Sequence, residues 1–254
     1  MKVRILGCGT STGVPRIGND WGRCDPAEPR NRRRRVSILV EAEGTRILVD
    51  TTPDLREQLN GADVATVHAV IWTHEHADHV HGIDDLRQLF HNAGVPVNGF
   101  AAARTLTSLR ERFTYIFEGR WGYPSVAHLS PLEPVFTVGP LTIRAAEQPH
   151  GAITSTGLRF EQAGRAVGYA TDFKDLPDDS LSFYEGVDLW IADALRERPH
   201  PSHSHLDQTI AYAARIGAPR TVLTHMDNSM DYRLLLDSLP PHIEPAYDGM
   251  EIEL

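Results

Sequence analysis

Residues 73–79 read Thr-His-Glu-His-Ala-Asp-His, and this stretch decides how the rest of the chain is interpreted. It follows an apolar run at residues 68–73 that is typical of a buried strand. Four potential metal ligands stand together here: His74, His76, Asp78 and His79. Two histidines one residue apart can share one ion, and the Asp78–His79 pair at a helix start can face a second. A polar loop that is histidine-rich by chance is the alternative, which so demanding a spacing disfavours.

Three further candidates each stand at the end of a predicted strand later in the chain. They are His150, Asp172 and His225. A single histidine at such a position is more often a solvated loop residue, but with the first motif the three complete a set of seven ligands. Imidazole and carboxylate donors without a thiolate suit zinc, manganese or iron. The sequence therefore predicts two divalent metal ions, with zinc favoured and manganese as the alternative.

The segments around the metal motif alternate between strand and helix patterns. Strands are expected at residues 3–9, 36–41, 46–50, 68–73, 136–146 (a hairpin), 155–161, 166–171, 187–192, 220–224 and 251–254. Helices are expected at residues 53–59, 79–91, 104–117 and 205–216. Each half begins with strand pairs and ends in strand–helix units, which predicts an α/β protein with two sheets and helices outside them. Residues 1–254 are expected to form one domain.

Composition narrows the classes of function. A net charge of −9 disfavours a basic nucleic-acid-binding surface. No apolar run approaches the roughly 18 residues that a membrane span requires, and the first residues are too quickly followed by glycines for a secretory signal. Two cysteines, Cys8 and Cys24, cannot make a disulfide framework. We therefore expect a cytoplasmic protein with neither a membrane nor a stable nucleic-acid partner.

The order of the seven ligands resembles the metallo-β-lactamase superfamily, and the resemblance covers essentially the whole chain. It implies a four-layer αββα sandwich. One metal would be held by His74, His76 and His150. The other would be held by Asp78, His79 and His225, with Asp172 and a hydroxide bridging the two ions. Asp50, after the strand at residues 46–50, would orient a ligand histidine, although a strand-end cap is the alternative.

Three segments resemble the phosphodiesterase branch of this superfamily, which includes tRNase Z and the carbon–phosphorus lyase accessory enzyme that opens a ribosyl cyclic phosphate. The first is the glycine-rich opening at residues 7–15, where glycines would let the backbone approach a substrate. The second is residues 204–208, where the branch carries a non-ligand histidine that donates a proton. His205 is therefore the favoured general acid, with His200 and His203 as alternatives. The third is residues 247–252, Tyr-Asp-Gly-Met-Glu-Ile, to which we assign no chemical role.

Departures from these enzymes limit the assignment. The cyclic-phosphate enzyme has an extra cysteine-rich zinc site near its N-terminus, completed by a histidine three residues after the last metal histidine. Here the region holds only Cys24 and the later position is Asn228, so no third ion is expected. The branch's His-x-x-Glu becomes His205 and Gln208, and no long glycine- and proline-rich arm for gripping tRNA is recognisable. A small substrate is therefore favoured over tRNA.

The sequence-based hypothesis is a binuclear metal-dependent phosphodiesterase acting on a small cyclic phosphate or nucleotide-like phosphodiester. A metal-bound hydroxide would attack phosphorus, Asp78 would belong to the catalytic set, and His205 would protonate the departing alkoxide. One alternative is a metal-dependent thioester, lactone or lactam hydrolase. The others are an RNA-processing nuclease and a non-enzymatic metal-binding protein.

Two groups of side chains have competing interpretations. The basic run Arg32, Arg33, Arg34 and Arg35 could bind phosphates or form a solvated edge before a strand. An aromatic group could wall a base-stacking pocket, form a homodimer contact, or simply pack in the core. Its members are Phe113, Tyr115, Phe117, Trp121 and Tyr123.

Overall fold

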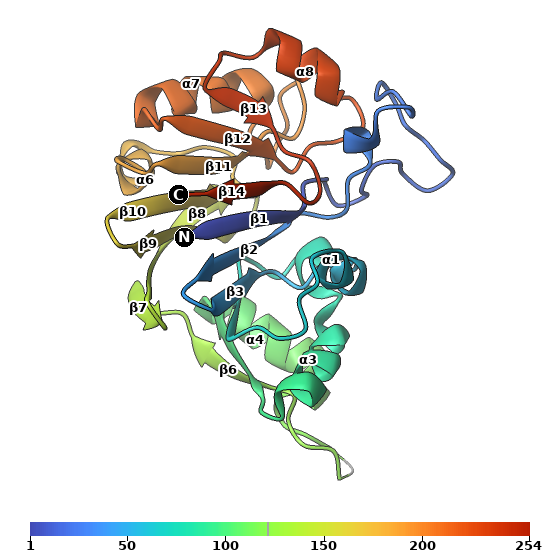
Figure 1. The fold of residues 1–254 in the computed structure, drawn as a ribbon, viewed down its shortest axis with the longest axis vertical. Coiled ribbons are helices and arrows are strands. Elements are labelled where there is room, and N and C mark those ends of the chain that lie inside the picture. The colour runs from blue at the N-terminus through green and yellow to red at the C-terminus, as the bar shows by residue number, and fades with distance from the viewer. Residues whose placement is uncertain (121) are drawn as a thin grey trace.

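The computed structural model describes residues 1–120 and 122–254, which form two seven-stranded sheets packed face to face (Figure 1). Trp121 lies outside the described residues. The first sheet has the spatial order β14-β1-β2-β3-β4-β5-β6, and the second has the order β13-β12-β11-β10-β9-β8-β7. The first sheet consists of β1 (Lys2–Gly7), β2 (Ser37–Ala42), β3 (Thr45–Val49), β4 (Ala69–Trp72), β5 (Val97–Ala101), β6 (Ala127–Pro131) and β14 (Glu251–Glu253). The second consists of β7 (Val135–Val138), β8 (Leu141–His150), β9 (Ile153–Gln162), β10 (Arg165–Ala170), β11 (Leu189–Asp193), β12 (Arg220–Thr224) and β13 (Ile243–Pro245).

Both sheets change from antiparallel to parallel pairing part of the way across. In the first sheet β3 to β6 run parallel, and in the second β10 to β13 do. The carboxyl ends of parallel strands meet at one edge of a sheet, where loops can present side chains from several strands. The metal motif follows β4 and the later candidates stand at or just after the ends of β8, β10 and β12. The topology therefore gathers residues that are far apart in the sequence.

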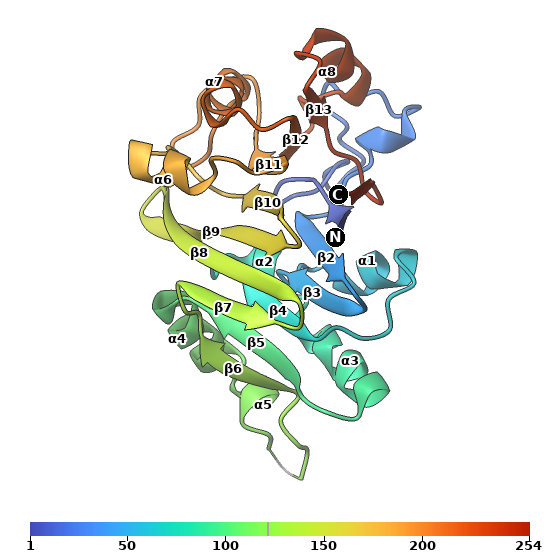
Figure 2. The same ribbon diagram turned by 60° about the vertical axis from the view of Figure 1, so that its left-hand side comes forward.

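Helices cover the outer face of each sheet, which confirms the expected αββα sandwich. Figure 1 shows α1, α3 and α4 on one side of the two sheets and α6, α7 and α8 on the other, and Figure 2 shows the same layering from a second direction. The helices are α1 (Leu55–Gly61), α2 (Ala77–Val80), α3 (Leu86–Ala93), α4 (Ala103–Arg112), α5 (Thr114–Phe117), α6 (Asp178–Phe183), α7 (Leu206–Ile216), α8 (Tyr232–Ser238) and the 3₁₀ turns η1 (Pro29–Asn31) and η2 (Ile83–Asp85). None of the helices in the described part of the chain is both long enough and apolar enough to cross a membrane.

Alternate residues of the central strands face two different cores. In β4, Ile71 belongs to the core between the sheets, whereas Val70 and Trp72 belong to the core beneath α1 and α3. In β2, Val40 and Leu39 divide in the same way. Because a strand's side chains alternate between its faces, a strand buried on both faces needs a continuous apolar run. This is why β4 and β12, which precede His74 and His225, read as apolar runs.

The expected helix at residues 79–91 is divided into α2, η2 and α3, which corrects the sequence-based prediction. The backbone leaves the helix at Gly82, whose amide donates to the carbonyl of Thr51 at 2.9 Å. A Cβ at Gly82 would stand 1.8 Å from the Thr52 carbonyl oxygen, so only glycine permits this approach. The interruption is tertiary in origin, because the loop after β3 packs against the metal loop.

Other elements escaped the sequence patterns for identifiable reasons. The expected helix at residues 104–117 breaks at Phe113, between α4 and α5. Strand β5 was missed because it contains Gly99, which weakens the strand pattern. A Cβ there would stand 2.5 Å from the ring of Trp72, so the glycine is needed for the close approach of that ring. Strands β6 and β13 and helices α6 and α8 are short and were also not predicted.

The glycines after β1 serve packing against a neighbouring segment of the chain. A Cβ on Gly7 would lie 2.1 Å from the carbonyl oxygen of Arg35, and one on Gly9 would lie 2.9 Å from the carbonyl oxygen of Arg34. Gly9 also donates its amide to that Arg34 carbonyl at 2.7 Å. From the sequence we expected these glycines to let the backbone approach a substrate. At Gly7 and Gly9 they instead allow the close approach of a neighbouring segment of the chain.

Replacement Gly7→Ala tests this explanation. The new methyl group would collide with a backbone oxygen that cannot rotate away, so we expect the free energy of unfolding to fall by more than about 2 kcal/mol. Chemical denaturation measures the change. Gly61→Ala is the matched control because its Cβ would have only the flexible end of Arg34 nearby, at 3.6 Å. Equal stability of the two variants would contradict the packing role.

Candidate metal centre

Three imidazole nitrogens converge on one point near the ends of β4 and β8. The Nδ1 atom of His76 lies 3.0 Å from Nε2 of His74 and 3.2 Å from Nε2 of His150. One oxygen of Asp172, Oδ2, lies 3.7 Å from the His74 nitrogen and 3.6 Å from the His150 nitrogen. These four atoms form a cluster of the size that surrounds a single ion.

A second cluster forms around the other oxygen of the same carboxylate. Asp172 Oδ1 lies 3.3 Å from Nε2 of His79 and 3.4 Å from Nε2 of His225. Asp78 Oδ2 lies 3.4 Å and 3.6 Å from these two nitrogens. All seven predicted ligands therefore stand around two adjacent points, with Asp172 shared between them.

The geometry and the unmatched atoms fit a pair of metal ions. Metal–nitrogen bonds of about 2.0–2.1 Å in a tetrahedral site place the ligand atoms about 3.3–3.4 Å apart, which is close to the separations in both clusters. The buried Nε2 atoms of His79 and His225 have no hydrogen-bond partner in the described residues. A buried polar atom without a partner carries a substantial free-energy penalty, and coordination of a cation would remove it.

Neighbouring groups fix the orientation of the candidate ligands. Asp50 Oδ2 accepts a hydrogen bond from His79 Nδ1 at 2.7 Å, so the contact that the sequence suggested for Asp50 is present. The same carboxylate accepts the backbone amide and the hydroxyl of Thr73, at 2.7 and 2.8 Å. His150 is held by its Nδ1, which donates to the Ser202 carbonyl at 2.8 Å. These contacts leave the Nε2 atoms of both histidines directed toward the clusters.

Buried charge divides the histidines into two groups. Burial lowers the pKa of His74 well below its usual value and also lowers that of His150, so both rings are neutral and can offer a lone pair. Burial alone would lower the pKa of His225, but Asp172 and Asp78 raise it to about 9. Burial alone would raise the pKa of Asp172, but His225 and His79 hold it well below its usual range. The carboxylates thus attract positive charge, which divalent cations would supply in place of protons.

Three of the central residues have left-handed backbone conformations. The φ angles are +66° at Asp50, +52° at Asp172 and +58° at His225, each just beyond the end of a parallel strand. This region is unfavourable for residues with a Cβ, although aspartate and histidine enter it more readily than most. The sharp turn directs each side chain into the site instead of along the strand, and it concentrates backbone strain where the ligands are needed.

The segment before α7 brings a different histidine to the centre from the one the sequence favoured. His203 stacks on His225 with ring centroids 4.8 Å apart, and its Nδ1 lies 3.8 Å from Asp172 Oδ2. His205 instead begins α7, and its Nδ1 contacts Gln208 Oε1 at 3.1 Å. The ring of His200 lies 5.1 Å from that of His203. Of the three candidates, His203 is the one in contact with the metal ligands in the described structure.

Asp193 is a site residue that the sequence reasoning missed. It ends β11, is fully buried, and accepts a hydrogen bond from His203 Nδ1 at 2.7 Å through Oδ2. Its other oxygen lies 3.7 Å from Nδ1 of His225. The signal was available, because Asp193 follows the apolar run at residues 189–192 just as Asp50 and Asp172 follow theirs.

The loop around Cys24 is held by a buried arginine. The guanidinium of Arg33 donates to the carbonyl oxygens of Asp227 and Met230, at 3.1 and 2.6 Å, and lies 3.9 Å from Cys24 Sγ. Arg33 is only 2% exposed. It therefore joins the loop after β1 to the turn that follows His225. The absence of a third ion here remains a prediction.

The C-terminal motif also has a structural role. Asp248 accepts the backbone amides of Cys8 and Arg34, at 3.1 and 2.7 Å, and so connects the end of the chain to the loop after β1. Burial raises the pKa of Asp248 to about 6.

The aromatic side chains at residues 113–123 do not form one group. Phe113 and Phe117 pack against the core beneath the first sheet, whereas Tyr115 and Tyr123 are exposed.

Comparisons with known proteins agree with this arrangement. The sequence matches the beta-lactamase superfamily domain over residues 45–226. An octanoyltransferase from Porphyromonas gingivalis is 34% identical, with 99% of this chain aligned to 51% of that protein, so this chain spans about half its length. The crystal structure of a new diphosphatase from the PhnP family is 33% identical, covers 99% of this chain and 96% of its own, and has a TM-score of 0.90. The short form of human tRNase Z is 19% identical, covers 100% and 99%, and has a TM-score of 0.73, which is a likeness of fold.

Metal analysis of two variants tests the shared carboxylate. We expect two ions per wild-type chain, loss of both in Asp172→Ala, and loss mainly of the second in His225→Ala. The reason is that Asp172 faces both clusters, whereas His225 faces one. Elemental analysis of the purified proteins, with circular dichroism as the control for folding, gives the stoichiometry. A folded Asp172→Ala variant that retains two tightly bound ions would disprove the bridging role.

Proposed function

The chain belongs to the metallo-β-lactamase superfamily, as the order of its ligands predicted, and we propose that it is a binuclear metal-dependent hydrolase of a small phosphodiester. The observation that carries this proposal is the His203–Asp193 pair beside the shared Asp172. A metal centre alone suffices for a substrate with a good leaving group. A positioned proton donor is needed when the leaving group is an alkoxide, as in an aliphatic phosphodiester.

The candidate ligands form two sets, each of which would bind one cation. His74, His76 and His150 would hold one ion. Asp78, His79 and His225 would hold the other, and Asp172 would serve both. Two divalent cations at such a site activate water and offset the negative charge that develops on a phosphoryl group. The nitrogen and oxygen donors favour zinc, with manganese as the alternative.

His203 would act as the general acid. Asp193 accepts the hydrogen bond from Nδ1, and this fixes the tautomer and leaves Nε2 to exchange a proton with the departing oxygen. The same contact holds the ring in place beside Asp172. His205 lacks such a partner, since its Nδ1 faces the amide oxygen of Gln208. We therefore assign to His203 the role that the sequence pattern had favoured for His205.

The substrate class rests on chemistry and on one relative. A structure 33% identical to this chain is that of a diphosphatase, which supports an ester or anhydride of phosphoric acid as the substrate. The name of the Porphyromonas relative points to acyl transfer, but that protein is about twice as long. We propose a small, nucleotide-like substrate without a stable nucleic-acid or membrane partner, and we leave a homodimer as an open alternative.

A panel of substrates tests the proposed class. We expect the metal-loaded protein to hydrolyse an aryl phosphodiester such as bis(p-nitrophenyl) phosphate with a higher kcat/KM than an octanoyl thioester or a β-lactam. Two cations held by these residues would match the negative charge of a phosphodiester better than a neutral acyl group. Steady-state kinetics on one preparation decides the order. Faster cleavage of the thioester or the lactam would contradict the proposal.

The role of His203 can be separated from that of His205 by varying the leaving group. In His203→Ala, turnover of a phosphodiester with an alkoxide leaving group should fall by roughly 10²–10⁴-fold. Turnover of a nitrophenyl diester should fall much less, because nitrophenolate departs without a proton. His205→Ala is the matched control and should change neither substrate by more than a few-fold. Equal losses for both leaving groups in His203→Ala, or loss of metal, would exclude it as the acid.

A further inference from the structure

A cavity of about 540 Å³ lies between the loop after β1 and the segment that leads into β2. We call it the arginine pocket and define it by Arg30, Arg32, Arg34 and Arg35, together with residues 12–15, Tyr247 and Asp248. Its volume is in the range of sites for small molecules. Figure 1 shows the segment that carries it, in blue, on the right-hand side of the molecule, below α8 and above α1.

The pocket carries an excess of positive charge in an otherwise acidic protein. Arg35 is neutralised by Asp54, whose oxygens lie 3.0 and 3.1 Å from its Nη1. Arg30, Arg32 and Arg34 have no carboxylate within 4.0 Å of their guanidinium nitrogens in the part of the chain described. The guanidinium of Arg34 is directed elsewhere, because its Nη1 would lie 3.6 Å from a Cβ on Gly61, which lines a different cavity. Since the net charge of the chain is −9, the two unpaired guanidinium groups of Arg30 and Arg32 attract anions locally in an otherwise acidic protein.

Aromatic rings, rather than carboxylates, hold two of these side chains. The guanidinium of Arg30 lies 4.9 Å from the ring centroid of Tyr232 and 5.2 Å from that of Tyr247. The guanidinium of Arg32 lies 5.1 Å from the ring of Trp21. A guanidinium over a ring face keeps the N–H donors at its edge free. The groups are therefore positioned in advance and still able to grip an oxyanion by two hydrogen bonds.

The backbone that carries the pocket is fixed and adjoins the metal centre. Buried Arg33 anchors the basic run, so its neighbours on either side project from a rigid base. The loop after β1 makes backbone hydrogen bonds in two directions. The amide of Gly9 donates to the carbonyl of Arg34 at 2.7 Å, and the amide of Thr10 donates to the carbonyl of Met226 at 3.2 Å. Met226 directly follows the ligand His225. The loop after β1 therefore lies between the basic run of the arginine pocket and the segment that follows His225.

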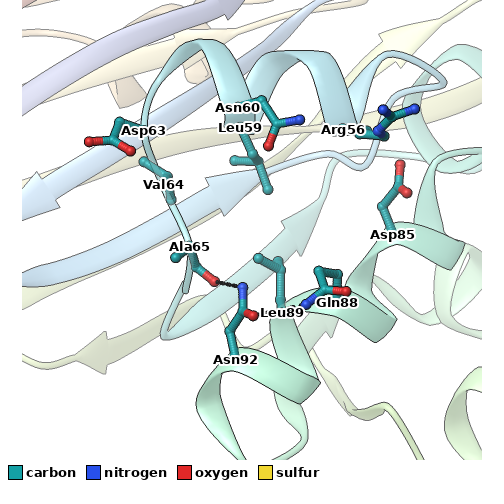
Figure 3. A pocket seen from close by; sticks show the side chains of 10 residues that line it. All are labelled: Arg56, Leu59, Asn60, Asp63, Val64, Ala65, Asp85, Gln88, Leu89 and Asn92. Atoms are coloured by element: carbon teal, nitrogen blue, oxygen red, sulfur yellow. Dashed lines mark hydrogen bonds between the residues drawn. The ribbon is translucent and has the colours of Figure 1, made fainter.

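Another cavity of similar size lacks these properties. It measures about 500 Å³ and lies between α1 and α3 (Figure 3). Its one cationic lining side chain, Arg56, faces Asp85 across the cavity, and Asp63 also lines it. Its lining therefore carries one positive and two negative side chains, and no anionic ligand is favoured there. The arginine pocket differs in composition rather than in size.

We propose that the arginine pocket binds a phosphate group of the substrate other than the one that is cleaved at the metal centre. The ligand class is a phosphomonoester or terminal phosphate dianion, which guanidinium groups bind through paired hydrogen bonds. A long nucleic acid is disfavoured, because it would need an extended basic surface rather than one local cavity in an acidic protein. This inference rests on the proposed phosphodiesterase function and adds that the preferred substrate carries a second phosphate.

Two aryl substrates with the same leaving group provide the kinetic test. They are thymidine 5′-(p-nitrophenyl phosphate) and its 3′-phosphorylated form, which differ by one phosphomonoester. We expect the wild-type protein to show a KM at least about tenfold lower for the phosphorylated form. The variant Arg30→Gln/Arg32→Gln should lose this preference and keep its kcat for both substrates. Absence of any preference in the wild-type protein, or a preference that survives the double substitution, would overturn the proposal.

A charge-matched control separates the pocket from a general electrostatic effect. The variant Arg87→Gln/Arg215→Gln removes two exposed arginines on α3 and α7, each paired with an aspartate, and should retain the preference. Loss of the preference in this control would assign it to net charge and not to the pocket. Raising the salt concentration should weaken the preference in the wild-type protein, because the sites are partly exposed.

A binding measurement keeps the inference testable if the proposed function fails. Calorimetric titration with inorganic pyrophosphate should detect binding that is weakened at least about tenfold in Arg30→Gln/Arg32→Gln and unchanged in the control variant. The same binding should persist in Asp172→Ala, whose metal clusters are dismantled. Inactivity toward every phosphodiester with this binding pattern intact would refute the proposed function alone. Pyrophosphate binding that is indifferent to the arginines, or that disappears only with Asp172, would refute the pocket.

Discussion

The carboxylate of Asp172 is the constraint on which the rest of the site depends. Its two oxygens face two different clusters of nitrogens, so its position sets the separation of the clusters and the orientation of both. Asp172 is almost completely buried and stands at the end of β10, between the two sheets. A buried carboxylate is stable only with compensating positive charge, and the surrounding histidines and the cations they would hold provide it. The fold therefore buries the negative charge of Asp172, which would be unfavourable in the apolar core without this compensation.

The fold supplies the stability that this arrangement uses. Left-handed backbone at Asp50, Asp172 and His225 costs on the order of 1–3 kcal/mol for each residue. Full burial of a large apolar side chain contributes roughly 1.5–3 kcal/mol, and the strands that end at these positions contain several such side chains. A few buried residues per strand thus offset the local strain. The rigidity of the sheets then holds each strand end, and the ligand beyond it, in place.

The segment between β1 and β2 has two structural connections that meet at Arg33. Toward the metal centre, Arg33 binds the carbonyl oxygens of the turn that follows His225, and so supports the second cluster from outside. Toward the solvent, the same residue anchors the basic run whose other arginines line a cavity. Arg33 itself, and not the arginines beside it, is therefore the residue that contacts both the turn after His225 and the basic run.

The sequence by itself predicted the seven candidate ligands that the structure brings together, the αββα architecture and most of the strands. Most of these candidates follow an apolar run whose period and length mark a buried strand. It favoured His205 over His200 and His203 as the general acid, because all three precede α7 and the sequence does not show which side chain faces the metal candidates. It also missed Asp193, and it could not distinguish Arg33 from the arginines beside it. These distinctions depend on tertiary contacts, such as that of His203 with Asp172 and Asp193, and that of Arg33 with the distant Met230. Local patterns report which face of a strand is buried, but only the packing of the two sheets decides which polar groups meet at their shared edge.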